Sequence, residues 1–122
     1  MVIAGKDCPQ QAGVQQVAEA TVQCLKRTVP AAVPGIVFLS GGQSDEIATA
    51  HLNAMNAVKS GQPWPLSFSY GRALQAPALK SWKGVPANVA AAQKALYHRA
   101  KCNGAACYGR YNPEMEKDAL AA

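Results

Sequence analysis

The stretch that decides the fold of this chain is residues 33–46, which read VPGIVFLSGGQSDE. Gly35 opens the run from Ile36 to Leu39, which is short, apolar at every position and partly β-branched. Such a run is typical of a buried strand in a parallel sheet. It stops at Ser-Gly-Gly-Gln, and Ser44 follows as the predicted N-cap of a helix that carries two acidic residues in its first turn. The stretch therefore predicts a strand, a tight turn and a helix start in succession.

Helices are predicted on both sides of this strand. Residues 14–27 have apolar side chains near helical spacing, and the sequence before Pro30 ends that helix because a residue that precedes proline leaves the α region. The helix after Ser44 is predicted to run to about residue 58. The apolar positions of the two helices are Val14, Val17, Ala18, Thr21 and Leu25, followed by Ile47, Ala48, Leu52, Met55 and Val58.

The second half of the chain repeats the pattern. A turn over residues 59–63 leads to a second predicted strand at 65–69, which stops at Tyr-Gly-Arg. Residues 73–80 are predicted to be helical, with Pro77 near an end or at a kink. The longest predicted helix begins at Pro86 and runs to about Cys107.

The order helix, strand, helix, strand, helix defines an α/β architecture, because parallel strands need crossover helices. Two parallel strands leave both edges of the sheet unpaired, so the chain is predicted to be a segment of something larger. Alone, it should be molten, aggregated or dependent on oligomerisation. We expect one structural segment over residues 1–111 and a polar, mobile tail over residues 112–122.

The chemistry is expected where the two strands end. In α/β proteins ligands bind at the carboxyl ends of the strands, where glycines let backbone N–H groups approach an anion and a helix start adds further donors. Arg72 adds a planar fork that suits phosphate. A tight turn and a surface salt bridge are the plain alternatives for these residues. Together the strand ends predict a phosphate site made by Ser40, Gly41, Gly42, Ser69, Gly71 and Arg72.

Composition and motifs exclude several other classes. The net charge of +5 comes from scattered basic residues rather than from a cluster with interleaved aromatics, which favours small anionic substrates over nucleic acid. The longest uncharged stretch, residues 28–44, contains prolines and glycines and cannot be a membrane helix, and no signal peptide is recognisable, so the cytoplasm is the expected location. Neither a P-loop nor a dinucleotide-binding glycine motif occurs, and no cofactor is expected.

The remaining reactive and aromatic residues are given structural roles. His51 and His98 have no recognised ligand spacing to a carboxylate or a cysteine, so no metal site is expected, and His98 is predicted to be solvated. The four cysteines are expected to be free thiols, with Cys24 on an apolar helix face. Trp64 and Trp82 are expected to be packing residues.

Residues 33–44 and 66–75, VPGIVFLSGGQS and LSFSYGRALQ, closely resemble class I fructose-bisphosphate aldolase. The segment Arg27-Thr-Val-Pro30 and the alanine-rich helix from Asn88 to Cys107 resemble the same family. The resemblance extends from Met1 to about Tyr111.

The resemblance implies a fold, an activity and a site. Such aldolases are (β/α)8 TIM barrels of glycolysis and gluconeogenesis, homo-oligomeric as full-length subunits, that cleave fructose 1,6-bisphosphate reversibly to dihydroxyacetone phosphate and glyceraldehyde 3-phosphate. They use a lysine Schiff base and no metal. The chain would be the C-terminal part of such a barrel, and its strand-end residues would bind a phosphate of the phosphorylated sugar substrate.

The sequence also departs from the family pattern. The Schiff-base lysine of the family lies in a Leu-Leu-Lys-Pro-Asn motif just before the Met-Val that matches Met1-Val2, and Lys6 does not match it. No catalytic residue is therefore assigned, and the 122-residue chain is expected to be inactive alone. Many members end in a functional tyrosine, where this chain ends in alanines. An independent, non-catalytic phosphate-binding or interaction module is the alternative function. Preference for the bisphosphate or for fructose 1-phosphate stays open.

Overall fold

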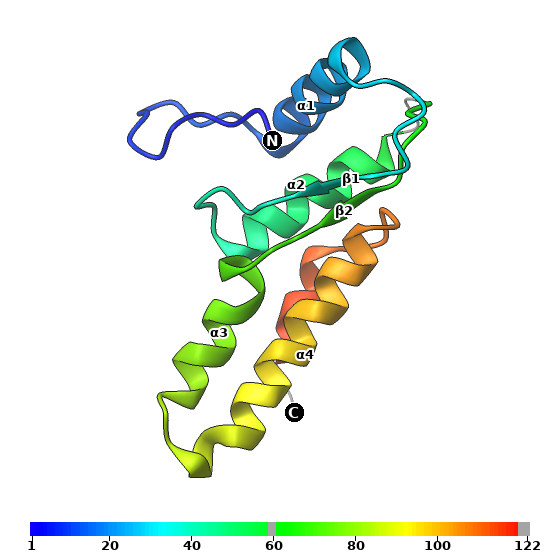
Figure 1. Cartoon of the computed structure of the whole chain (residues 1–122). Helices are drawn as coiled ribbons and strands as arrows, with labels where there is room; N and C mark the ends of the chain where they lie inside the picture. Colours follow the sequence, from blue (N-terminus) through cyan, green and yellow to red (C-terminus); the bar gives the residue numbers. More distant parts are fainter. Residues whose placement is uncertain (59–60, 120–122) are drawn as a thin grey trace.

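The fold alternates helices with two short parallel strands (Figure 1). The computed structural model describes residues 1–58 and 61–119, so the turn predicted at 59–63 lies partly outside the described residues. The elements are α1 (Val14–Thr28), β1 (Ile36–Phe38), α2 (Asp45–Ala57), β2 (Leu66–Phe68), α3 (Arg72–Trp82), η1 (Pro86–Asn88), α4 (Val89–Ala106) and η2 (Pro113–Ala119). The predicted α/β class and the predicted order of helices and strands are confirmed.

The two strands pair in parallel with α2 as their crossover. Ile36 is paired with Leu66 and Phe38 with Phe68, so alternate side chains of both strands lie on the same face of the sheet. That face belongs to the core. On the other face Val37 is 64% exposed, and Leu39, just beyond the strand, is 72% exposed. The prediction of a strand buried on both faces is wrong for the described residues, because they cover only one face.

The core is centred on α2, which lies between α1 and α4 and behind the sheet in Figure 1. Ala48, Leu52 and Met55 are fully buried there. Trp64, before β2, is also buried, and its indole N–H donates to the carbonyl of Pro30 at 2.9 Å, which ties the two strand entries together. The other buried apolar members of the core include Ala18 and Val22 of α1, Phe38, Leu66, and Cys102 and Ala106 of α4.

Helices α3 and α4 run side by side as a long hairpin that extends away from the sheet (Figure 1). Pro77 lies inside α3 rather than near an end, which decides between the two positions allowed by the sequence. Trp82 ends α3 near the tip of the hairpin and is 42% exposed, so its predicted packing role is wrong. Cys24 is also exposed, because the buried stripe of α1 is formed by Val17, Ala18, Thr21 and Val22 instead.

The segment after α4 returns along that helix rather than leaving it. The sequence predicted a mobile tail over residues 112–122, but residues 113–119 form η2, and residues 120–122 lie outside the described part. The contact is made by Glu116, whose carboxylate accepts hydrogen bonds from Arg99, His98 and Tyr111 at 2.5, 3.1 and 3.0 Å. We call His98, Arg99, Cys102, Tyr111 and Glu116 the α4–η2 cluster.

The prediction of a solvated His98 is wrong. Its side chain is only 12% exposed, and its Nε2 faces Glu116 at 3.1 Å and the Sγ of Cys102 at 3.7 Å. His98 and Cys102 are four residues apart on one helix, so they share a face. No helix in the described ranges has the length and apolar character needed to cross a bilayer.

Candidate phosphate site at the strand ends

The parallel register brings the two predicted loops to the same edge of the sheet. The amide of Ser69 donates to the carbonyl of Phe38 at 2.7 Å, so the two strands stay paired up to the residues where their loops begin. Ser40 and Ser69 stand at these turns, and Gly41 and Arg72 follow on the same end of the sheet. The predicted adjacency of the two loops is therefore confirmed.

The first loop owes its shape to Gly41 and Gly42. Their φ angles are +64° and +82°, a conformation that side-chain-bearing residues adopt only with strain. The amide of Gln43 closes the turn onto the carbonyl of Ser40 at 3.2 Å. Within the described residues, no backbone carbonyl accepts from the amides of Gly41 or Gly42. The loop thus keeps two N–H donors that are available to a ligand.

The side chain of Gln43 fixes this loop to α2. Its Nε2 donates to the carbonyl of Ser40 at 2.6 Å, and its Oε1 lies 2.5 Å from Nδ1 of His51. Burial, and then the positive N-terminus, lowers the pKa of His51. A neutral ring with a proton on Nδ1 suits this contact, because it donates to the amide oxygen. His51 is therefore a support for the loop, a role that its sequence position did not indicate.

The second loop is fixed by Tyr70. Its buried hydroxyl donates to the carbonyl of Ala48 at 2.8 Å, and its ring lies 5.4 Å from that of Phe68. Burial, and then the neighbouring Cys107, raises the pKa of Tyr70, so the hydroxyl keeps the proton that this bond needs. Gly71 then caps α3 without a side-chain hydrogen bond. No side chain caps the first amides of α3, which stand at the positive end of the helix dipole.

Arg72 links the two loops. Its Nη2 lies 3.9 Å from the position where a Cβ on Gly42 would stand, so the guanidinium reaches over the first loop. A cavity of about 410 Å³ lies beside it and is lined by Gln43, Ser44, Asp45, Arg72, Ala73, Ala76, Pro77 and Lys80. Lys80 adds a second positive charge that the sequence analysis missed, because it stands two helical turns beyond Arg72 on the same face.

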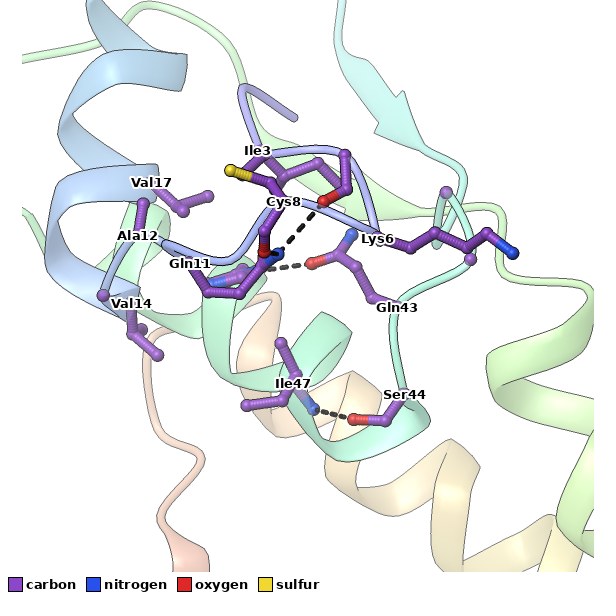
Figure 2. Close-up of a pocket in the computed structure, with 16 residues that line it drawn as sticks. Ile3, Lys6, Cys8, Gln11, Ala12, Val14, Val17, Gln43, Ser44 and Ile47 are labelled. Atoms are coloured by element: carbon purple, nitrogen blue, oxygen red, sulfur yellow. Dashed lines mark hydrogen bonds between the residues drawn. The ribbon is translucent and has the colours of Figure 1, made fainter.

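A larger cavity of about 850 Å³ opens on the other side of the first loop, under the segment that precedes α1 (Figure 2). Lys6 lines it together with Gly41, Gly42 and His51. Cys8 and Gln11 close its outer wall, where Nε2 of Gln11 donates to the carbonyl of Cys8 at 2.9 Å and to that of Gly5 at 3.0 Å. The first loop therefore has a cavity on each side, with Lys6 in one and Arg72 in the other.

Comparison with known proteins assigns the chain to a family. The sequence profile of the glycolytic class-I fructose-bisphosphate aldolases matches residues 1–122. The chain belongs to the class-I fructose-bisphosphate aldolase family. The resemblance seen in the two strand-end motifs is thereby confirmed.

Individual aldolases are similar over nearly the whole chain. A probable class 1 aldolase of Xanthomonas campestris is 61% identical over 112 residues, which are 91% of this chain and 33% of that protein. Aldolase B of Sparus aurata is 57% identical over 118 residues, 97% of this chain and 32% of that protein. The chain spans about a third of the length of the curated aldolases that it matches.

A solved aldolase has the same fold over the matched region. The Plasmodium falciparum enzyme, in a ternary complex with TRAP and a small-molecule inhibitor, is 52% identical. It superposes with a TM-score of 0.87 over 92% of this chain and 32% of its own. The arrangement of α1 to α4 around two parallel strands is therefore that of a segment of an aldolase subunit.

Proposed function

We propose that this chain forms the C-terminal, phosphate-binding part of an aldolase barrel that cleaves fructose 1,6-bisphosphate. The observation that carries the proposal is the convergence of the two strand-end loops, with Arg72 reaching over Gly42. The strand-end site, Ser40, Gly41, Gly42, Ser69, Gly71 and Arg72, would hold one phosphate of the sugar. The uncovered face at Val37 and Leu39 supports further strands and a complete (β/α)8 barrel, homo-oligomeric and cytoplasmic like its family.

The chemistry of the site matches a phosphate dianion. The amides of Gly41 and Gly42 supply two donors, and the uncapped start of α3 supplies more together with its dipole. The serine hydroxyls add donors, and Arg72 adds two parallel N–H bonds to a pair of phosphate oxygens. Asp45 and Glu46 make the start of α2 acidic, whereas the first turn of α3 carries no acidic residue. The phosphate is therefore expected on the α3 side of the first loop.

Cleavage of the carbon–carbon bond would need the Schiff-base lysine of the family, whose motif does not occur in this sequence. A Schiff-base aldolase needs a lysine amine that can attack the substrate carbonyl. No lysine here stands in a Leu-Leu-Lys-Pro-Asn context. We expect no cleavage of fructose 1,6-bisphosphate by the 122-residue chain, and no lysine adduct after borohydride reduction with dihydroxyacetone phosphate. A single stoichiometric adduct on one lysine, above all on Lys6 in the larger cavity, would contradict the expectation that no lysine of this chain forms the Schiff base.

The site is tested best in a chimeric subunit in which these 122 residues replace the matching third of one of the full-length relatives. Arg72→Ala should weaken binding of fructose 1,6-bisphosphate about 10- to 100-fold, because a hydrogen bond to a charged group contributes about 1.5–3 kcal/mol. Arg72→Lys should recover only part of this, since the planar fork is lost. Calorimetric titration measures the affinities.

Arg27→Ala is the matched control, because Arg27 is exposed in the last turn of α1. Its affinity should equal that of the unmodified chimera. Equal affinity in the Arg72→Ala chimera would instead make Arg72 a structural residue. A chimera that binds phosphosugar normally but never cleaves it would favour a non-catalytic phosphate-binding module.

A further inference from the structure

The α4–η2 cluster contains three side chains whose ligand atoms face one another. The Nε2 of His98 lies 3.1 Å from Oε2 of Glu116 and 3.7 Å from Sγ of Cys102, and the three ligand atoms all lie within 4.8 Å of one another. Cys102 is fully buried, and the side chains of His98 and Glu116 are 12% and 16% exposed. We propose that His98, Cys102 and Glu116 form a zinc-binding site that fastens η2 to α4.

The geometry suits a tetrahedral ion. Zinc binds imidazole nitrogen and carboxylate oxygen at about 2.0–2.2 Å and thiolate sulfur at about 2.3 Å, so adjacent ligand atoms stand about 3.3–3.7 Å apart. The N–S separation of 3.7 Å lies at the upper end of that range, and the N–O separation of 3.1 Å is slightly shorter than it. Small rotations of the Cys102 and Glu116 side chains would bring sulfur and oxygen to the same separation. Three protein ligands leave the fourth position of the tetrahedron to water.

The donor set selects the class of metal. One imidazole, one thiolate and one carboxylate together favour zinc over magnesium or calcium, which take oxygen ligands only. The thiol proton is released to solvent when the metal–sulfur bond forms. The thiolate and the carboxylate then carry two negative charges, which balance the two positive charges of the ion. The buried Arg99 remains balanced by Asp45, whose Oδ2 lies 3.7 Å from its Nε.

The surroundings hold the ligands in place. Tyr111 donates to Oε1 of Glu116 at 3.0 Å, whereas Oε2 faces His98. Nη1 of Arg99 donates to that same Oε2 at 2.5 Å, so the metal would use the second lone pair of this oxygen. Nη2 of Arg99 donates to the hydroxyl of Thr49 on α2 at 2.6 Å. Such outer hydrogen bonds orient metal ligands and commonly change metal affinity about 10- to 100-fold. The Cys102 thiol faces Nε2 of His98 at 3.7 Å and also interacts with the Glu116 carboxylate.

Cobalt(II) is the probe that identifies a thiolate ligand, because a tetrahedral cobalt site with a sulfur ligand gives a charge-transfer band and intense visible bands. The test uses the 122-residue chain with Cys8→Ser and Cys24→Ser, which removes the two exposed thiols. We expect a saturable one-to-one spectrum that zinc displaces. Cys102→Ser should abolish the thiolate band and raise the Kd by at least about 100-fold, more than the loss of an outer-shell partner.

Cys107→Ser is the matched control, since Cys107 follows the same helix but faces Ser67 at 3.3 Å. It should keep the full spectrum, and Glu116→Gln should weaken binding without removing the sulfur band. Circular dichroism shows whether the 122-residue chain folds alone. If it does not, the same variants are compared in the chimeric subunit.

The position of η2 gives an independent readout. If zinc fastens Glu116, it should slow tryptic cleavage after Lys117 by at least about tenfold, because cleavage requires local opening of that segment. The Cys102→Ser variant should lose this protection. Absence of a thiolate–cobalt band in a folded protein, or a band that survives Cys102→Ser, would overturn the proposal.

Discussion

The strand-end site and the α4–η2 cluster are two polar regions of the described part of the chain, and they differ in how their polar groups are paired. At the strand ends, the amides of Gly41 and Gly42 have no carbonyl partner in the described residues. In the α4–η2 cluster, Glu116 accepts from three side chains at once, and the side chain of Arg99 is only 3% exposed. Open donors on a glycine loop indicate a place for an anion, whereas a buried ion pair between two elements indicates a contact that holds them together.

The largest expected effect is the removal of Arg99. Arg99→Ala leaves the carboxylate of Glu116 largely buried without its main partner, which should lower the free energy of unfolding by about 3–5 kcal/mol. Arg72→Ala, at the strand ends, should change it by no more than about 0.5 kcal/mol, because Arg72 is exposed. Urea denaturation of the chimeric subunit, followed by circular dichroism, measures both. Equal losses would erase the distinction between the two regions.

A pair of glycine substitutions sharpens the comparison at the backbone. Gly109 follows α4 with φ +65°, and a Cβ there would stand 3.0 Å from the amide nitrogen of Ala57. Gly42 has φ +82°, but a Cβ there would meet only the end of Arg72 at 3.9 Å. Gly109→Ala should therefore lower the free energy of unfolding by about 2–4 kcal/mol, from strain and clash together. Gly42→Ala should lower it by about 1–2 kcal/mol, from strain alone. Gly84→Ala, with φ +73° and open space, is the control for strain.

A smaller effect is expected at Ser44, which begins α2. Its hydroxyl accepts from the amide of Ile47 at 3.3 Å, so Ser44→Ala should cost about 1 kcal/mol. Ser44→Asp is the rescue variant, because aspartate also caps helices. If Ser44→Ala lowers phosphosugar affinity as well as stability, the hydroxyl belongs to the strand-end site and not only to the helix.

The smallest expected effect is a dependence of stability on pH at His51. Its pKa is lowered in the folded state by burial and then by the N-terminal charge, so the unfolded chain binds more protons near neutral pH. The stability that His51 contributes is present above the ordinary histidine pKa of 6.5 and is lost as the pH falls below it. His51→Gln should flatten this part of the stability curve. A curve unchanged by His51→Gln would show that His51 does not titrate with folding.

The sequence predicted the backbone well and the long-range pairings poorly. Ser44 as a cap, the two strands and the shared edge of Gly41 and Arg72 all follow from local spacing and turn chemistry. The α4–η2 cluster depends on contacts such as that of Arg99 with Glu116, which lies 17 positions further along the chain. No local sequence pattern predicts such a contact. The spacing of His98 and Cys102 was readable as one helix face, and it was overlooked. The exposure of Cys24 and Trp82 depends on which neighbours cover each helix.

The contrast between the two tryptophans has a practical consequence for spectroscopy. Trp64 is 4% exposed and holds its indole N–H on the carbonyl of Pro30, whereas Trp82 is 42% exposed near the tip of the hairpin. Their intrinsic fluorescence should therefore separate, with Trp64 emitting from an apolar environment and Trp82 from a partly aqueous one that iodide can quench. A Trp82→Phe variant would leave a single emitter in the core, whose red shift reports the parting of the two strand entries.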